Sequence, residues 1–324
     1  MEILGIHHVS SLTARAVNNL DFYVRVLGMR LIKKTVNQDD PSVYHLFYGD
    51  EQGSAGTELT FFEIPNMGQK YEGTNDIAVV SLRVPTDAAL TYWRERFETF
   101  QVPHESIQTK NGRAVLPFQD FEGHKMELVS DELNDGVKAG VVWGDSKAST
   151  EHGITGLGPI QLKVKHADRT ARVLTEVLGF KEIQAGTFDE TTPPRVFSTG
   201  QGGTGAEVYV YETENEPMVR LGRGGVHHVA FRVTDEEELR QWIRVLTNAG
   251  FSHSGFVDRH YFRSLYFREA NGILFELATD GPGFAVDEDA AYLGEALALP
   301  PFLEDKRASI EARLTPLPNP RTEM

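Results

Sequence analysis

The sequence contains no cysteine among its 324 residues. Disulfides, thiolate metal ligands and a cysteine nucleophile are therefore excluded, and the absence is typical of a cytoplasmic protein. No apolar run reaches the length of about 18 residues that a transmembrane helix requires. The N-terminal residues also lack a basic stretch followed by an apolar one, so we expect neither a secretory signal nor a membrane partner.

Basic residues are few as well. Lys and Arg number 32 against 47 Asp and Glu, which gives a formal net charge of −15. Because nucleic-acid binding depends on clustered Lys and Arg, the composition disfavours that class of partner. The charge favours solubility, and a hydrophobic content of 40% is enough for a globular core.

What the sequence does contain is an internal repeat. Residues 20–29 (LDFYVRVLGM) and 171–180 (ARVLTEVLGF) share apolar residues at three- and four-residue spacing, and both carry a glycine near the end. Each segment predicts an amphipathic helix that is closed by a glycine cap. A second pair of helices is predicted at 92–100 and 241–250.

Strand patterns repeat in step with these helices. Residues 123–131 (GHKMELVSD) and 272–280 (GILFELATD) match position by position, and weaker counterparts begin at Gly56 and Gly205. Opening strands are predicted at 6–13, 77–84, 158–164 and 226–233. Each unit therefore consists of one strand, one helix and about three further strands.

The repeat divides the chain into four βαβββ units, at about 1–65, 77–131, 157–213 and 224–280. The interval from His8 to Gly28 equals that from Pro159 to Gly179, whereas the second and fourth units share a longer interval. The chain is thus predicted to be a duplicated pair. We expect a first pair of units in 1–131, a polar linker at 132–156, a second pair in 157–280, and a C-terminal tail at 281–324 with a short helix at 302–314.

Two His-His pairs stand at matching places, His7-His8 and His227-His228, and Glu276 lies on the last predicted strand. Two imidazoles and one carboxylate on rigid strands form the facial triad that holds a non-haem Fe(II) and leaves coordination positions open. Neighbouring side chains of a strand point to opposite faces, so we expect only one histidine of each pair to face the metal.

Corresponding positions in the four units sort the candidate ligands. The opening strands hold, in order, His8, Val79, Pro159 and His228. The last strands hold, in order, Thr60, Glu127, Tyr209 and Glu276. Only the first and fourth units offer histidine, and only the second and fourth offer glutamate. Glu127 therefore lacks histidine partners and is expected to be a structural relic.

This organisation resembles the vicinal oxygen chelate superfamily, which includes glyoxalases, fosfomycin-resistance proteins and extradiol ring-cleaving dioxygenases. Within that superfamily the chain is most similar to the hydroquinone ring-cleaving dioxygenases. The likeness spans about residues 4–282 and is carried by Ile6-His7-His8, Tyr44–Tyr48 (YHLFY), Gly56-Thr57, Gly68–Lys70 and Phe275–Thr279. The resemblance implies an α+β fold of four βαβββ modules that form two cup-shaped mixed-sheet barrels. Because two modules enclose one metal in this superfamily, the triad requires module 1 to pair with module 4, and module 2 with module 3.

The resemblance also identifies the second histidine of each pair as the ligand. The expected ligands are His8, His228 and Glu276, and the expected metal is Fe(II), for which Mn, Ni or Zn could substitute in a crystal. Type I extradiol enzymes have a tyrosine ten residues before the ligand glutamate, and Tyr266 stands at that position. The likeness implies that Tyr266 hydrogen-bonds the substrate or bound oxygen.

Three further residues are candidates for a catalytic role. Arg259 could stabilise a phenolate, because a guanidinium group stays charged and donates planar hydrogen bonds. Ser10 shares a strand face with His8 and is therefore placed to touch the substrate. His227 is expected to assist in managing protons.

These features predict a dioxygenase that cleaves the ring of substituted 1,4-dihydroxybenzenes, with a small aromatic substrate and O2 as its partners. An extradiol catechol dioxygenase is an alternative, but Pro159 occupies the ligand position of the third unit. A glyoxalase-like isomerase or lyase is another, but Thr60 replaces the glutamate that it needs. A metal-free binding protein of the same fold is the third, which the retained triad disfavours. Assembly into a homo-oligomer stays open.

Overall fold

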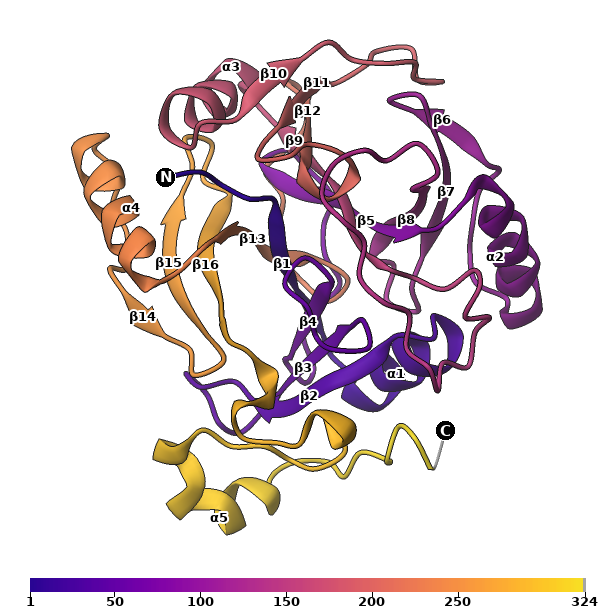
Figure 1. Ribbon diagram of the computed structural model, residues 1–324, viewed down its shortest axis with the longest axis vertical. Coiled ribbons are helices and arrows are strands. Elements are labelled where there is room, and N and C mark those ends of the chain that lie inside the picture. Colours follow the sequence, from indigo (N-terminus) through magenta and orange to yellow (C-terminus); the bar gives the residue numbers. More distant parts are fainter. Residues whose placement is uncertain (323–324) are drawn as a thin grey trace.

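The computed structural model describes residues 1–322, and it contains the four predicted units in order (Figure 1). The first comprises β1 (Ile6–Thr13), α1 (Ala16–Leu20), β2 (Arg30–Val36), β3 (Tyr44–Gly49) and β4 (Glu58–Glu63). The second comprises β5 (Asp76–Val84), α2 (Asp87–Phe100), β6 (Gln108–Lys110), β7 (Arg113–Gln119) and β8 (Lys125–Ser130). The third comprises β9 (Gly156–Val164), α3 (Ala167–Arg172), β10 (Lys181–Ile183), β11 (Arg195–Ser198) and β12 (Glu207–Glu212). The fourth comprises β13 (Val226–Val233), α4 (Glu236–Asn248), β14 (Val257–Asp258), β15 (Phe262–Arg268) and β16 (Leu274–Pro282).

The strands form two eight-stranded sheets, each shared by two units. One sheet has the order β14-β15-β16-β13-β1-β4-β3-β2, in which antiparallel β1 and β13 join the first unit to the fourth. The other has the order β10-β11-β12-β9-β5-β8-β7-β6, in which antiparallel β5 and β9 join the second unit to the third. The fold is therefore α+β with two mixed half-barrel sheets, and unit one lies beside unit four.

Two helices begin earlier than the sequence pattern predicted. α2 starts after Thr86, whose hydroxyl accepts a hydrogen bond from the Ala89 backbone N–H at 3.2 Å. α4 starts after Asp235, whose carboxylate accepts from the Glu238 N–H at 2.9 Å. These N-caps add a polar first turn to each helix, which a search for apolar spacing overlooks. Both helices pack against the last two strands of their own units.

The helices predicted near 20–29 and 171–180 are also present, but part of each is irregular. α1 continues into a π-helical turn at Asp21–Val26, and α3 continues into one at Val173–Val177. Both segments end at a glycine with positive φ, +70° at Gly28 and +77° at Gly179. Glycine adopts this conformation without strain, as the predicted caps require.

The C-terminal tail runs along β2, the edge strand of the first sheet (Figure 1). Lys33 of β2 donates to the Phe284 carbonyl at 2.9 Å and to Asp287 at 2.7 Å. Tyr261, which precedes β15, donates to the same Asp287 at 2.9 Å, so the tail links the two edge regions of this sheet. The short helix expected at 302–314 occurs as a 3-10 turn at Pro301–Lys306 followed by α5 (Arg307–Glu311). No helix within residues 1–322 has the length and apolar character needed to cross a membrane.

Candidate metal centre

Strand pairing brings the three predicted ligands together inside the sheet of units one and four. His8 lies on β1, His228 on β13 and Glu276 on β16, and β13 pairs with both of the other strands. The Nε2 atoms of His8 and His228 lie 3.1 and 2.8 Å from Oε2 of Glu276. The two Nε2 atoms are 3.3 Å apart. All three side chains are almost fully buried, with at most 3% of each residue exposed.

This donor set fits a single cation. Ligand bonds of about 2.1 Å at right angles separate neighbouring donor atoms by about 3.0 Å, close to the distances in this cluster. Both carboxylate oxygens of Glu276 are buried, and neither accepts a well-directed hydrogen bond from residues 1–322, although two imidazole nitrogens lie beside one of them. A buried carboxylate in this situation is costly unless a cation neutralises it.

The electrostatics of the cluster also suit a metal. Burial would raise the pKa of Glu276, but the neighbouring His8 and His228 hold it well below its usual range. Burial lowers the pKa of His228, even though Glu276 opposes that shift. These shifts favour the carboxylate form of Glu276 and the neutral form of His228, which are the forms that bind a metal.

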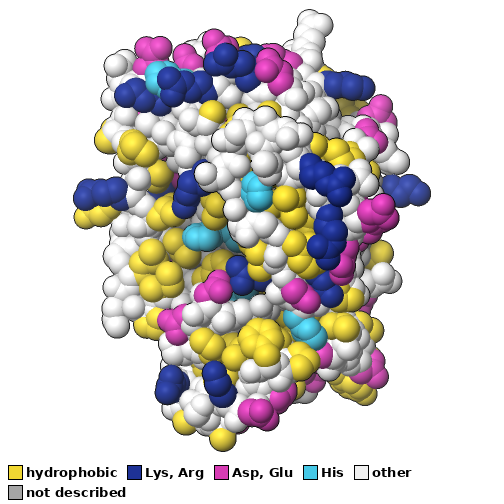
Figure 2. All heavy atoms as spheres, turned by 90° about the vertical axis from the view of Figure 1, so that its left-hand side faces the viewer, with side chains coloured by type: hydrophobic (Ala, Val, Ile, Leu, Met, Phe, Trp, Pro, Cys, Tyr) yellow, Lys and Arg dark blue, Asp and Glu magenta, His cyan; other side chains and the backbone are white. Residues whose placement is uncertain are grey.

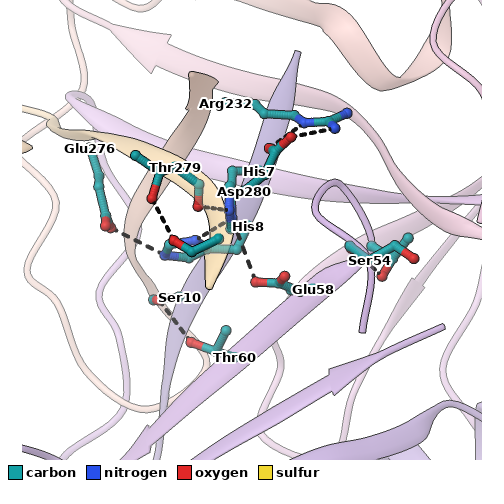
Figure 3. A network of polar contacts seen from close by, with 12 residues as sticks. His7, His8, Ser10, Ser54, Glu58, Thr60, Arg232, Glu276, Thr279 and Asp280 are labelled. Carbon is teal, nitrogen blue, oxygen red and sulfur yellow. Dashed lines mark hydrogen bonds and ion pairs between the residues drawn. The ribbon is translucent and has the colours of Figure 1, made fainter. Parts of the chain in front are cut away.

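His7 sets the tautomer of His8. The Nε2 atom of His7 lies 3.0 Å from the backbone carbonyl of Thr279, which can only accept a hydrogen bond, so Nε2 carries the proton (Figure 3). Burial lowers the pKa of His7 to about 3, and its Nδ1 therefore carries a free lone pair. Nδ1 of His8 lies 3.0 Å from Nδ1 of His7 and donates to it. This contact selects the His8 tautomer that has its hydrogen on Nδ1 and leaves Nε2 to bind a metal.

A second group with metal-type donors lies behind the first and consists of His7, His8 and Glu58. Oε2 of Glu58 is 3.5 Å from Nδ1 of His7. Burial, with a contribution from Asp50, raises the pKa of Glu58 well above its usual value, so this carboxyl group is neutral. Because Nδ1 of His8 already donates to His7, we interpret this group as support for the ligand rather than as a second metal site.

His227 repeats this arrangement beside the other histidine ligand. Its Nδ1 lies 2.8 Å from Nδ1 of His228, and burial together with His228 lowers its pKa to about 4. Strict alternation along a strand would have sent the first histidine of each pair away from the second. The β1–β13 register is irregular between Ile6 and His8 and again after Ser10, which twists the strands away from strict alternation.

The triad opens onto a cavity of about 300 Å³, at the lower end of the range for small-ligand sites. Figure 2 shows histidine among hydrophobic side chains where this face of the molecule is hollowed. Much of the lining is apolar and aromatic, and it includes Phe47, Phe62, Phe262 and Leu274. His8 and His228 reach the same cavity. The arrangement suits a flat apolar ring that presents an oxygen to the metal.

Tyr266 and Arg259, both predicted to act on the substrate, lie together on the cavity wall. Tyr266 stands directly opposite Glu276 in the β15–β16 register, which accounts for their ten-residue offset. Arg259 donates from Nε to the Tyr266 hydroxyl oxygen at 3.2 Å. Burial raises the pKa of Tyr266, so the hydroxyl keeps its proton. Arg259 also forms an ion pair with Asp39 at 3.3 Å.

Ser10 lines the cavity, and it begins a hydrogen-bonded chain that the sequence did not reveal. Its Oγ lies 2.7 Å from Oγ1 of Thr60, and that oxygen lies 3.0 Å from Nε2 of His45 (Figure 3 shows the first contact). No role for His45 was predicted from the sequence, although this residue belongs to the YHLFY phrase that carries the family resemblance. Its place in that phrase was a sequence signal that could have pointed to a role in the site.

The sheet of units two and three has no equivalent triad within residues 1–322. Glu127 accepts hydrogen bonds from Ser81 at 2.8 Å and Gln161 at 2.7 Å, and Nζ of Lys110 lies 3.0 Å from its other oxygen. The ammonium group of Lys110 therefore supplies the positive charge that a metal would supply in the first sheet.

Comparison with known proteins identifies relatives that match this chain over nearly its whole length. The Glyoxalase/Bleomycin resistance protein/Dioxygenase superfamily model matches residues 5–128 and 156–277. MhqA of Bacillus subtilis (strain 168), provisionally named a ring-cleaving dioxygenase, is 52% identical over 317 residues, which cover 98% of this chain and 100% of the relative. The chlorohydroquinone/hydroquinone 1,2-dioxygenase of Sphingobium indicum is 28% identical over 309 residues, which cover 93% of this chain and 92% of the relative.

A solved structure shows the same fold over its whole length. A crystal structure from Bacillus subtilis subsp. subtilis str. 168, of a protein provisionally named a dioxygenase, superposes with a TM-score of 0.88 at 33% identity. The match covers 100% of this chain and 99% of that one. The four-unit architecture is therefore shared from end to end.

Proposed function

The chain belongs to the glyoxalase/bleomycin resistance protein/dioxygenase superfamily and is a ring-cleaving dioxygenase, and we propose that it uses Fe(II) and O2 to open substituted 1,4-dihydroxybenzenes. The observation that carries the proposal is the buried cluster of His8, His228 and Glu276 at the base of a small aromatic-lined cavity. Two imidazoles and one carboxylate leave open positions on the metal for a phenolate and for O2. The relative named chlorohydroquinone/hydroquinone 1,2-dioxygenase supports the choice of substrate.

When bound, Fe(II) would lower the pKa of a coordinated phenol and conduct electron density from the ring to O2. The chain's own residues prepare the site for this chemistry. His7 and His227 contact the ligand histidines through Nδ1, which keeps Nε2 of each ligand available. The aromatic wall formed by Phe47, Phe62 and Phe262 excludes water and orients a flat substrate.

Tyr266 and Arg259 would stabilise negative charge and donate hydrogen bonds to a substrate bound in the cavity. Because Arg259 donates to the Tyr266 oxygen, the hydroxyl proton of Tyr266 is free to point toward a bound ligand. A neutral phenol held in this way donates a hydrogen bond to an oxygen that gains negative charge. The guanidinium group of Arg259 adds a fixed positive charge beside that hydroxyl group.

Two observations favour this function over the alternatives. Thr60 stands where a four-ligand glyoxalase-type site would need a glutamate, and it is engaged with Ser10 and His45. The third unit, in which catechol-cleaving enzymes place a ligand, has Pro159 at that position and contributes no strand to the sheet of the triad. A hydroquinone needs only one oxygen on the metal, and a triad of protein ligands leaves room for that oxygen and for O2.

The test is anaerobic reconstitution with Fe(II), followed by metal analysis and measurement of O2 uptake. Hydroquinones, catechols and a methylglyoxal–thiol adduct would be offered in parallel. We expect uptake of O2 with hydroquinones and release of a ring-opened product. Preferred turnover of catechols, or isomerisation of the adduct without O2, would contradict the proposal. Reconstitution with Mn, Ni or Zn in place of Fe(II) tests the choice of metal.

A further inference from the structure

His45 stands on β3, two strands away from the ligand His8. β3 pairs with β4, and β4 pairs with β1, so the two residues face one cavity from separate strands. The His45 ring is packed between Phe47 and Phe62, with its centroid 4.0 Å from each of theirs. This packing holds the imidazole in one orientation on the cavity wall.

Only one nitrogen of His45 is engaged. Nε2 bonds to Oγ1 of Thr60, which also bonds to Ser10, whereas Nδ1 has no polar partner among residues 1–322. Burial lowers the pKa of His45 well below its usual value, so the ring is neutral. A neutral imidazole offers one donor and one acceptor, so Nδ1 presents a single hydrogen-bonding atom of defined position.

Several other residues on the cavity wall are engaged in contacts of their own. Gln38 donates to the Arg259 carbonyl at 2.8 Å, and Asp39 pairs with the Arg259 side chain. Asn37 accepts from the Asp39 backbone N–H at 3.0 Å, and Tyr261 donates to Asp287. Among the cavity histidines outside the triad, His45 and His227 each keep one ring nitrogen without a polar partner among residues 1–322, and of these two His227 lies beside the ligand His228.

The repeat does not require a histidine at this place. His45 lies opposite Phe62 in the β3–β4 register, and the corresponding residues are Val115, opposite Val129, and Ser264, opposite Ala278. Neither counterpart carries a ring nitrogen. Because strands lie about 4.8 Å apart, β3 is about 10 Å from β1, which is comparable to the reach of a dihydroxybenzene bound to the metal.

We propose that Nδ1 of His45 hydrogen-bonds the substrate hydroxyl that cannot reach the metal. The inference rests on the proposed function, because a 1,4-dihydroxybenzene places its two oxygens at opposite ends of the ring. When one oxygen lies at the triad, the other lies against the opposite part of the cavity wall, where it is buried and needs a hydrogen-bond partner. His45 would then select para-dihydroxy rings over phenols with a single hydroxyl group.

The test compares two ligands of similar shape, hydroquinone and 4-methylphenol, which lacks the second hydroxyl group. Binding to the Fe(II)-loaded protein would be measured under anaerobic conditions, so that turnover does not intervene. We expect the wild-type protein to prefer hydroquinone, because one hydrogen bond separates the two ligands. His45→Phe, which keeps the ring packing, should weaken hydroquinone binding roughly tenfold and change 4-methylphenol binding little.

Two further variants separate the nitrogens. In His45→Gln the side-chain amide reaches the position of Nε2 and can keep the Thr60 contact, so hydroquinone should still bind about tenfold more weakly. In His45→Asn the amide lies at the position of Nδ1 and should recover part of the affinity. Iron content and thermal stability of each variant serve as controls for folding.

An equal loss for both ligands would reduce His45 to a packing residue and overturn the inference, as would unchanged hydroquinone binding in all three variants. A failure of the proposed function can be told apart from a failure of this inference. A wild-type protein that prefers hydroquinone in a His45-dependent way but consumes no O2 with it would retain this inference and lose the dioxygenase assignment for that substrate.

Discussion

Glu127 and Glu276 hold corresponding positions on the last strands of the second and fourth units, yet their carboxylates face different partners. Glu276 faces two imidazoles that converge on it at 2.8 and 3.1 Å. Glu127 faces the ammonium group of Lys110 at 3.0 Å, with Ser81 and Gln161 on its other oxygen. One repeat position thus serves a metal-type site in one sheet and an internal ion pair in the other. The difference makes the two glutamates a natural pair for mutagenesis.

Replacing a ligand should remove the metal without unfolding the protein. We expect His8→Ala to lose bound iron and ring-cleaving activity, because the two remaining donors no longer complete the facial triad. Metal analysis after reconstitution and O2 uptake would measure the effect. His166→Ala, which changes an exposed histidine far from the triad in sequence, is the matched control and should keep both properties. Full iron content in His8→Ala would contradict the ligand assignment.

Glu127→Gln should keep activity but lower stability. Removing this carboxylate leaves buried Lys110 with Glu190, at 3.3 Å, as its one remaining ionic partner among residues 1–322. Breaking a buried ion pair on one side costs about 3–5 kcal/mol in the free energy of unfolding, and the remaining partner should reduce this to roughly 2–3 kcal/mol.

Denaturant unfolding would measure the Glu127→Gln effect. The double variant Glu127→Gln/Lys110→Met should recover part of the loss, because it also removes the stranded ammonium group. Loss of iron in Glu127→Gln would overturn the view of the second sheet as metal-free.

Tyr266→Phe should retain iron and slow turnover. The hydroxyl group lies on the cavity wall rather than among the converging donors, and a positioned proton donor contributes about 10²–10⁴-fold to rate. Loss of the Arg259 hydrogen bond should cost only about 1 kcal/mol of stability. Steady-state kinetics with the best hydroquinone would measure kcat and KM. Unchanged values would remove Tyr266 from the mechanism, whereas loss of iron would place it in support of the metal.

His7→Phe should weaken metal binding while leaving all three ligands in place. The substitution keeps a ring next to Phe262, whose centroid is 5.4 Å from that of His7. It removes the lone pair that accepts from His8, so the His8 tautomer is no longer fixed. Changes of this kind typically lower metal affinity 10–100-fold. Competition with a chelator would report the dissociation constant, and an affinity equal to that of the wild-type protein would contradict the tautomer argument.

The repeat could be predicted from local periodicity and from comparison of equivalent positions, which depend only on residue order. The fold class and the choice of His8, His228 and Glu276 as ligands were predicted from those positions together with the resemblance to a known superfamily. The structure shows the repeat as a shared strand order, β2-β3-β4-β1 in the first unit and β14-β15-β16-β13 in the fourth. Helix starts were less predictable, because N-caps at Thr86 and Asp235 add polar turns outside the apolar pattern.

The tertiary structure decided which neighbours the conspicuous residues have. The roles of His7 and His227 depend on a register irregularity in β1 and on the Thr279 carbonyl, which lies far away in the chain. The position of Lys110 beside Glu127 requires β6 and β8 to fold into one sheet. His45 became a candidate for binding the substrate only because strand pairing places it on the cavity wall, with one ring nitrogen free of polar partners among residues 1–322. Such contacts join residues that are distant in sequence, and they arise from packing rather than from any local pattern.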